Sequence, residues 1–212
     1  LKDLGVHSEM FCDAFFDLYK AGKITNMRKK RDTGRSVFTF TLCTKETMDF
    51  LDNNPLVASY NCDYVTNTFS IAQEENMFSI NSILELDLVG QAVSESIGAT
   101  QYSGTGGALS FTAGSYESKG GTAVLCFPST FKDKEGKLHS KIKPALTPGS
   151  IVTIPRSVIS TVATEYGCVN IKGLGLWRRT EKIIGLAHPD FRDELIKEAE
   201  KMKIWRKSNK ID

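Results

Sequence analysis

The chain has 212 residues, of which 41% are hydrophobic and 25% are charged, and its formal net charge is +2. This apolar content excludes a disordered chain, and the near balance of charges excludes general nucleic-acid binding. No apolar run approaches the ~20 residues of a membrane-spanning helix, and no signal peptide is visible. We therefore expect a protein of the cytoplasm that binds neither nucleic acid nor membrane.

In chain order, apolar spacing and capping residues predict helices, and alternating or continuous apolar runs predict strands. Helical patterns cover residues 13–20, 44–51, a segment that begins after Thr66 and Asn67, 177–186 and 190–204. Strand patterns cover residues 37–42, 57–65, 83–89, 122–127, 151–154 and 169–171. This alternation predicts an α/β fold with an open, mostly parallel sheet flanked by helices.

Several local features carry further expectations. Alternation in the strand at 83–89 should point Glu85 and Asp87 outward, and Asp190 should cap the last helix after a break at Pro189. The basic run at residues 28–31 is expected to be a solvated loop. The five cysteines are odd in number and form no C-x-x-C pair, which predicts buried free thiols and no metal site or disulfide framework.

Glu9 is the first candidate for chemistry, because it lies on a strand-like segment that runs directly into a helical pattern. A partly desolvated carboxylate at a strand end gains basicity and nucleophilicity, and carboxylates act as covalent nucleophiles in some enzymes. The alternative is structural: Glu9 could cap the nearby helix or pair with a lysine.

Seven glycines fall within residues 98–121, and the densest group is Ser103-Gly104-Thr105-Gly106-Gly107. Glycine lets the backbone approach a ligand closely, and successive N–H groups can form an anion nest. The sequence matches neither the dinucleotide-binding nor the P-loop consensus. A tight turn between two elements therefore remains an open alternative.

Two further residues combine a structural and a chemical possibility. Asn67 stands where a helix should begin, so it could cap that helix or donate its amide to an oxyanion. Lys132 follows the predicted buried strand at 122–127, and ligands gather at the carboxyl ends of strands in open α/β sheets. It could meet a phosphate or another anion, or it could be an ordinary surface lysine.

Nearly the whole chain, from Leu4 to about Leu195, resembles the acetyl-CoA hydrolase/transferase family. The segments that carry the resemblance follow in order: LGVHSEMFCDAFFDLYKAGKIT, DNNPLV, YVTNTFSIAQEENMFSINS, ELDLVGQ, SIGATQYSGTGGALSF, FPSTFKD, ATEYG and AHPDFRDEL. The 4-hydroxybutyrate and butyryl-CoA:acetate CoA-transferases are the members with the most similar motifs. The resemblance implies an open α/β fold of the CoA-transferase (NagB/RpiA-like) type.

The resemblance also implies a mechanism and site residues. A glutamate attacks an acyl-CoA thioester and later carries CoA as a glutamyl thioester, and its position matches Glu9. The family's oxyanion asparagine falls on Asn67 and its backbone donor on Gly107. The glycine loop, with Gly104 and Gly106, and Lys132 are expected to contact CoA, which is a substrate and not a permanently bound cofactor.

The resemblance predicts that residues 1–212 are the C-terminal, glutamate-bearing domain of a longer protein whose N-terminal CoA-transferase domain is absent from this chain. The expected partners are acyl-CoA, short carboxylic acids, that N-terminal half and a second copy in a homodimer. One departure is Ala108, where many members have Gln or Ser after the glycine pair. Two alternatives stay open: an acyl-CoA hydrolase with the same residues, and a non-catalytic CoA-binding or assembly domain.

Overall fold

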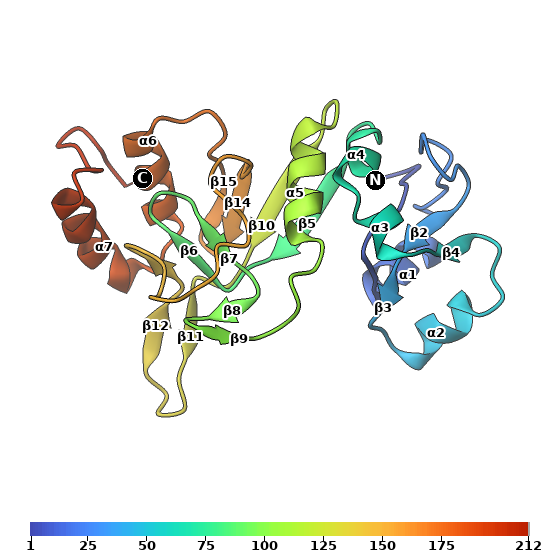
Figure 1. Cartoon of the computed structure of the whole chain (residues 1–212), viewed down its shortest axis with the longest axis horizontal. Coiled ribbons are helices and arrows are strands. Elements are labelled where there is room, and N and C mark those ends of the chain that lie inside the picture. Colours follow the sequence, from blue (N-terminus) through green and yellow to red (C-terminus); the bar gives the residue numbers. More distant parts are fainter. Residues whose placement is uncertain (212) are drawn as a thin grey trace. The chain divides into compact units, whose positions relative to one another are not determined.

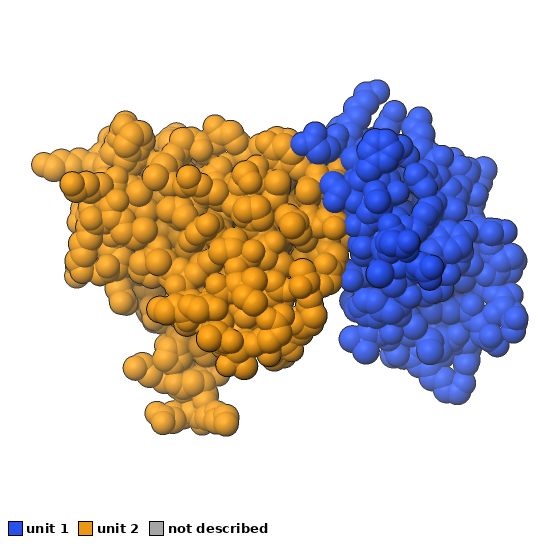
Figure 2. Space-filling model, viewed as in Figure 1, with its two compact units in different colours: residues 1–77, 117–121 blue, residues 78–116, 122–212 orange. Residues whose placement is uncertain are grey.

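The computed structural model describes residues 1–211, and the chain divides into two compact units (Figure 2). Unit 1 consists of residues 1–77 and 117–121, and unit 2 consists of residues 78–116 and the chain from residue 122 onward. Within residues 1–211, no helix is long and apolar enough to cross a membrane.

Unit 1 is built from short elements around three extended segments that run parallel to one another (Figure 1). Its strands are β1 (Met10–Phe11), β2 (Ser36–Phe38), β3 (Phe40–Thr41) and β4 (Val57–Ser59). Its helices are α1 (Asp13–Lys20), α2 (Lys45–Leu51), α3 (Cys62–Val65) and α4 (Thr68–Ala72). Strand β1 pairs with β3, and β2 pairs with β4.

An aromatic cluster fills the space between α1 and these strands. Phe11 is fully buried, and its ring lies 5.4 Å from both Phe15 and Phe38. Phe50 of α2 packs against Phe16 and Tyr19 of α1, with ring centroids 4.9 and 5.0 Å apart. Helix α1 has the predicted bounds, and Gly22 follows it with φ +63, a conformation that suits glycine.

The main sheet of unit 2 has the strand order β15-β14-β10-β5. These strands are β5 (Phe78–Ser82), β10 (Thr122–Cys126), β14 (Thr161–Thr164) and β15 (Gly167–Asn170). Strands β5, β10 and β14 are parallel, and β15 returns antiparallel to β14. The predicted α/β fold with a mostly parallel sheet is therefore confirmed.

Three helices accompany this sheet: α5 (Ala108–Glu117), α6 (Leu176–Gly185) and α7 (Pro189–Lys201). Helix α5 lies beside β5 (Figure 1), where the Ser79 hydroxyl donates to the carbonyl of Phe111. Helices α6 and α7 bury apolar side chains in the same core as the sheet, among them Ile183, Ile184, Leu195 and Ala199.

Smaller strand pairs complete unit 2. A three-stranded sheet contains β6 (Glu85–Asp87), β7 (Ala92–Val93) and β13 (Ile142–Lys143). Two antiparallel pairs are β8 (Ser96–Ile97) with β9 (Thr100–Gln101), and β11 (Thr130–Lys132) with β12 (Leu138–Ser140).

Two predicted strands are wrong in part. The strand expected at 57–65 ends at Ser59, and Cys62–Val65 is a helical turn with Asp63 in its first turn, where an acidic residue is favourable. Residues 151–154 form only a bridge from Ile154 to Ala92. The N–H of Ile151 instead donates to the Ser96 hydroxyl. This backbone donor therefore takes no part in strand pairing, although the run is rich in β-branched residues.

The prediction that Glu85 and Asp87 of β6 point outward is wrong. Asp87 is buried and accepts hydrogen bonds from the N–H groups of Val89 and Gln91, and Glu85 accepts from the N–H and hydroxyl of Thr147. Both carboxylates therefore satisfy turns, a role that period-two alternation does not reveal.

Helix α7 and the cysteines also differ from expectation. The helix begins at Pro189, which suits the first helical position, and the His188 side chain caps it in place of Asp190. All five cysteines are free, but none is buried: Cys62 and Cys168 are exposed and the others are half-buried.

Candidate functional site

Glu9 lies at a bend between two stretches of parallel pairing. Before it, the N–H of Val37 donates to Val6 and the N–H of Ser8 donates to Val37, both at 3.0 Å. At the bend, the Glu9 carbonyl accepts from the N–H groups of Thr39 and Phe40, at 2.9 and 3.1 Å. Regular pairing resumes at Met10, so the backbone of Glu9 is fixed from both sides while its side chain is half-buried.

The buried side chain of Lys29 is hydrogen-bonded to the backbone of this segment. Lys29 is 8% exposed, and its Nζ donates to the carbonyls of Val6 and Arg35 at 3.0 and 2.8 Å. Burial lowers the pKa of Lys29 to about 8, although Glu74 and Asp32 oppose the shift. A solvated loop was therefore the wrong prediction for Lys29, which ties together the two strands on either side of its own loop.

Glu74 holds the same loop from another direction. Its side chain is 5% exposed, and its two carboxylate oxygens accept from the N–H groups of Lys30 at 2.7 Å and Arg31 at 3.1 Å. Sequence reasoning missed both Lys29 and Glu74. The partners lie 44 and 43 residues apart along the chain, so no local pattern could reveal them.

Asn67 is the N-cap of α4, as the structural alternative predicted. Its Oδ1 accepts a hydrogen bond from the Ser70 N–H at 3.0 Å, and the residue is exposed. The cap uses only the amide oxygen, so the Nδ2 hydrogens are not consumed by it. Capping and donation to a ligand are therefore compatible at this residue.

His7 connects two parts of unit 1, the Glu9 segment (residues 6–11) and the Asn67 segment (residues 65–70). The imidazole is 6% exposed, and its Nε2 lies 2.8 Å from the carbonyl oxygen of Val65. His7 precedes Glu9 by two residues, and Val65 precedes Asn67 by two residues.

The glycine loop in unit 2 leads into a helix that the sequence analysis did not predict. Gly104 and Gly106 are exposed, Gly107 is buried, and Phe111 N–H donates to the Gly107 carbonyl in the first turn of α5. Only Gly106 has a positive φ, of +61, among these three glycines. The N-terminus of a helix favours anions, so this missed helix strengthens the expectation of an anion near the loop.

The entry to the loop is fixed by the carbonyl of Glu95. This oxygen accepts from the N–H groups of Tyr102 at 2.7 Å and Ser103 at 3.2 Å, after the short β8–β9 hairpin. The loop is thus tied at both ends while residues 103–106 are exposed.

Lys132 lies on β11, in a hairpin beyond the carboxyl end of β10, and it is exposed. Ser129 anchors the hairpin: its N–H and hydroxyl donate to the two oxygens of Glu165, at 2.8 and 2.5 Å. Burial opposes ionisation of Glu165, but these two bonds keep its pKa below the usual value. The anchored turn fixes where the Lys132 strand begins.

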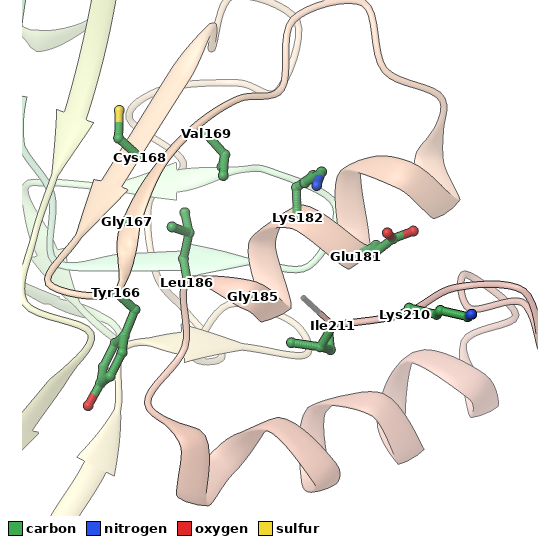
Figure 3. A pocket seen from close by; sticks show the side chains of 10 residues that line it. All are labelled: Tyr166, Gly167, Cys168, Val169, Glu181, Lys182, Gly185, Leu186, Lys210 and Ile211. Atoms are coloured by element: carbon green, nitrogen blue, oxygen red, sulfur yellow. The ribbon is translucent and has the colours of Figure 1, made fainter.

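The six predicted site residues are divided between the units. Glu9 and Asn67 belong to unit 1, and Gly104, Gly106, Gly107 and Lys132 belong to unit 2. None of them lines the pocket of about 240 Å³ in unit 2 that Figure 3 shows beside β15 and α6. Within residues 1–211, no group of three His, Cys, Asp or Glu side chains is placed to hold a metal ion.

Comparisons with known proteins agree on one family. The family described as "Acetyl-CoA hydrolase/transferase C-terminal domain" matches residues 43–199. The probable butyrate:acetyl-CoA coenzyme A-transferase of Syntrophomonas wolfei is 51% identical over 211 residues, which are 100% of this chain and 47% of that protein. The 4-hydroxybutyrate coenzyme A transferase of Clostridium kluyveri is 46% identical over 94% of this chain and 46% of its own length.

A solved structure agrees with these sequences. The crystal structure of RipA from Yersinia pestis superposes with a TM-score of 0.87 and 43% identity, over 96% of this chain and 45% of that chain. The chain therefore spans about half the length of the curated relatives it matches.

Proposed function

Because the chain belongs to the acetyl-CoA hydrolase/transferase family, as its C-terminal domain, we propose that the full-length protein transfers CoA from a short-chain acyl-CoA to a free carboxylate. The observation that carries the proposal is the family match together with a half-buried Glu9 whose backbone is fixed at a strand bend. The relatives named above are described as butyrate and 4-hydroxybutyrate transferases, which makes acids of this length the substrates to test.

In the proposed reaction, a Glu9 oxygen attacks the thioester carbonyl and expels CoA thiolate, which leaves an acyl-glutamyl anhydride. The thiolate then attacks the Glu9 carbonyl, releases the donor's carboxylate and forms a glutamyl-CoA thioester. The acceptor carboxylate reverses these two steps and leaves as the new acyl-CoA. A carboxylate nucleophile divides one difficult exchange into easier steps, and its fixed backbone reduces the entropy lost on the way to the transition state.

The oxyanions formed in these steps need donors whose positions are set in advance, each worth about 3–4 kcal/mol in typical enzymes. We assign one such role to the Asn67 amide, whose oxygen is already held by the Ser70 N–H. We assign another to the backbone N–H of Gly107 at the start of α5. Both are supported by rigid attachment to a helix terminus.

CoA contacts are assigned to the exposed glycine loop and to Lys132. Bare backbone at Gly104 and Gly106 can approach a ligand closely, and the exposed Lys132 ammonium can pair with a phosphate. We also propose two protein partners: the N-terminal half of the full-length protein and a second copy in a dimer. It remains a prediction that residues 1–212 form one C-terminal, glutamate-bearing domain.

The test uses the full-length protein with butyryl-CoA and acetate. Glu9→Gln keeps the size of the side chain but removes the nucleophile, so transfer should fall at least about 1000-fold, in the range seen when a covalent nucleophile is removed. Incubation with butyryl-CoA alone should add the mass of CoA to the peptide that contains Glu9, and borohydride should remove it. Glu46→Gln, on the exposed start of α2, is the matched control and should retain activity. Full transfer by Glu9→Gln would overturn the assignment.

The family description names hydrolases as well as transferases, so the acceptor is part of the test. A hydrolase turns over without any carboxylic acid, because water attacks the anhydride or thioester. We expect release of free CoA to depend on added acetate or another acid. Equal rates with and without acid would support the hydrolase.

A further inference from the structure

His7 is a buried histidine that the chemistry above does not use. Its Nε2 lies 2.8 Å from the Val65 carbonyl oxygen, and because a carbonyl only accepts, Nε2 carries the hydrogen of this bond. The side chain is 6% exposed, and Val65 is fully buried. This bond therefore joins two buried points of unit 1 that are 58 residues apart in the sequence.

The backbone of His7 is held as firmly as its ring. His7 pairs with Val37 in the parallel bridge, and its neighbour Val6 has a carbonyl that accepts from both Val37 N–H and Lys29 Nζ. The side chain thus extends from a fixed strand toward α3. Only Ser8 separates His7 from the bend at Glu9, and the Ser8 N–H is itself bonded to the Val37 carbonyl.

At the other end, the Val65 carbonyl lies at the last residue of α3, a helix of four residues. The carbonyls of the final turn of a helix lack partners within the helix, so a side-chain donor there helps to fix where the helix ends. Only Thr66 separates this point from Asn67, the N-cap of α4. A displacement of Val65 would therefore carry over to the Asn67 amide.

Burial favours the neutral form of the imidazole. Burial is the largest influence and lowers the pKa of His7, and the charge of Lys29 lowers it further. The Val65 carbonyl, Glu74 and Asp32 act in the opposite direction but do not cancel the effect. The ring of Tyr64 lies beside the imidazole, with the two ring centroids 6.5 Å apart.

We propose that His7 is a positioning residue, whose Nε2–H···O bond to Val65 sets the distance and orientation between the Glu9 carboxylate and the Asn67 amide. This inference rests on the proposed function, because it assumes that Glu9 and Asn67 act on the same reacting carbonyl. His7 itself touches neither substrate nor reacting atom in this proposal. Its effect comes through the two segments that it joins.

The test compares two substitutions in the full-length protein. His7→Leu removes the donor, and misplacement of reacting groups by about 1 Å can cost about 100-fold, so kcat should fall by about that factor. KM for acyl-CoA should change less than about three-fold, because the proposed CoA contacts lie in unit 2. His7→Gln places an amide N–H near the position of Nε2, and it should recover at least about ten-fold of the lost kcat over His7→Leu.

A matched control separates positioning from stability. Thr47 is also fully buried in unit 1, and its hydroxyl donates to Asp13 at 2.6 Å, so Thr47→Val should weaken the fold without disturbing the His7 link. Activity is expressed per folded molecule, from thermal denaturation of each variant. An equal loss of kcat in Thr47→Val and His7→Leu, or no recovery in His7→Gln, would overturn the inference.

Glu9→Gln, measured in parallel, distinguishes this failure from failure of the proposed function. Wild-type activity in Glu9→Gln would remove the nucleophile assignment and the His7 inference with it. An inactive Glu9→Gln beside a fully active His7→Leu would remove only the positioning role.

Discussion

The Glu9 segment and the glycine loop are held in different ways. The Glu9 segment is bound by strand pairing, by the buried Lys29 ammonium and by the His7 side chain, and its partners come from distant parts of unit 1. Residues 103–106 are exposed, and the loop is tied mainly at its ends, to the Glu95 carbonyl and to α5. A covalent nucleophile needs a fixed position, whereas a loop that admits a ligand needs accessible backbone.

The substitution with the largest expected effect on stability is Glu74→Ala. The substitution leaves the N–H groups of Lys30 and Arg31 without their acceptor, and we expect unit 1 to lose about 2–4 kcal/mol of stability. Native-state hydrogen exchange of the peptide that contains residues 6–11 measures the loss. Glu75→Ala is the control, since its half-exposed carboxylate only makes ion pairs longer than 3.5 Å and should cost under about 1 kcal/mol. Equal losses in the two variants would contradict the prediction.

Elements with local signals could be predicted from the sequence. Helix α1 has apolar residues at helical spacing and a glycine stop signal shortly after its end, and the Asn67 cap is encoded by the residue type at the start of α4. The order of the motifs also revealed the family. Each of these predictions depends on neighbouring residues or on resemblance, and each is confirmed.

Features that depend on distant partners could not be predicted. Helix α5 follows a glycine-rich stretch and buries small or polar residues such as Thr112, Gly114 and Ser115, so it lacks a clear apolar stripe. The buried state of Lys29 depends on carbonyls of Val6 and Arg35 that only the fold brings to it. The roles of the six predicted site residues stay predictions, since they concern a ligand.

A second test places one methyl group in each region. An alanine Cβ at Gly5 would lie 2.6 Å from Cγ of Lys29, so Gly5→Ala must displace the buried lysine and should cost about 1–2 kcal/mol. At Gly104 a Cβ would meet nothing within 4 Å, so Gly104→Ala should change stability by less than about 0.5 kcal/mol. Hydrogen exchange is the measurement, at residues 6–11 for Gly5→Ala and at residues 103–111 for Gly104→Ala, each compared with the wild type. A Gly104→Ala protein as unstable as Gly5→Ala would show that the loop is packed as tightly as the Glu9 segment.

A third test uses pH to probe Lys29. Its pKa in the folded protein is about 8, below the ordinary value of 10.5, so between these values the unfolded chain holds a proton that the folded chain has released. The contribution of Lys29 to the free energy of unfolding should therefore rise with pH across this window, by up to about 1.4 kcal/mol per pH unit. Lys29→Met lacks the titrating group, so the difference in stability between the wild type and this variant should shift in favour of the wild type from pH 8 to pH 10. Lys45→Met, at an exposed lysine of α2, controls for the loss of a lysine from another part of unit 1.

Gly106→Ala should have a small effect on stability and a clear effect on binding of acyl-CoA. Its φ of +61 costs an alanine about 1 kcal/mol, and an exposed loop can relax part of that strain, so stability should fall by less than this amount. The altered backbone should instead raise KM for acyl-CoA in the full-length enzyme by about ten-fold, equivalent to 1.4 kcal/mol of lost binding. Gly106→Asn tolerates the left-handed conformation and should fall between the wild type and Gly106→Ala. A loss of stability with unchanged KM would assign the loop a structural role. The loop would then be held by its packing, as the Glu9 segment is.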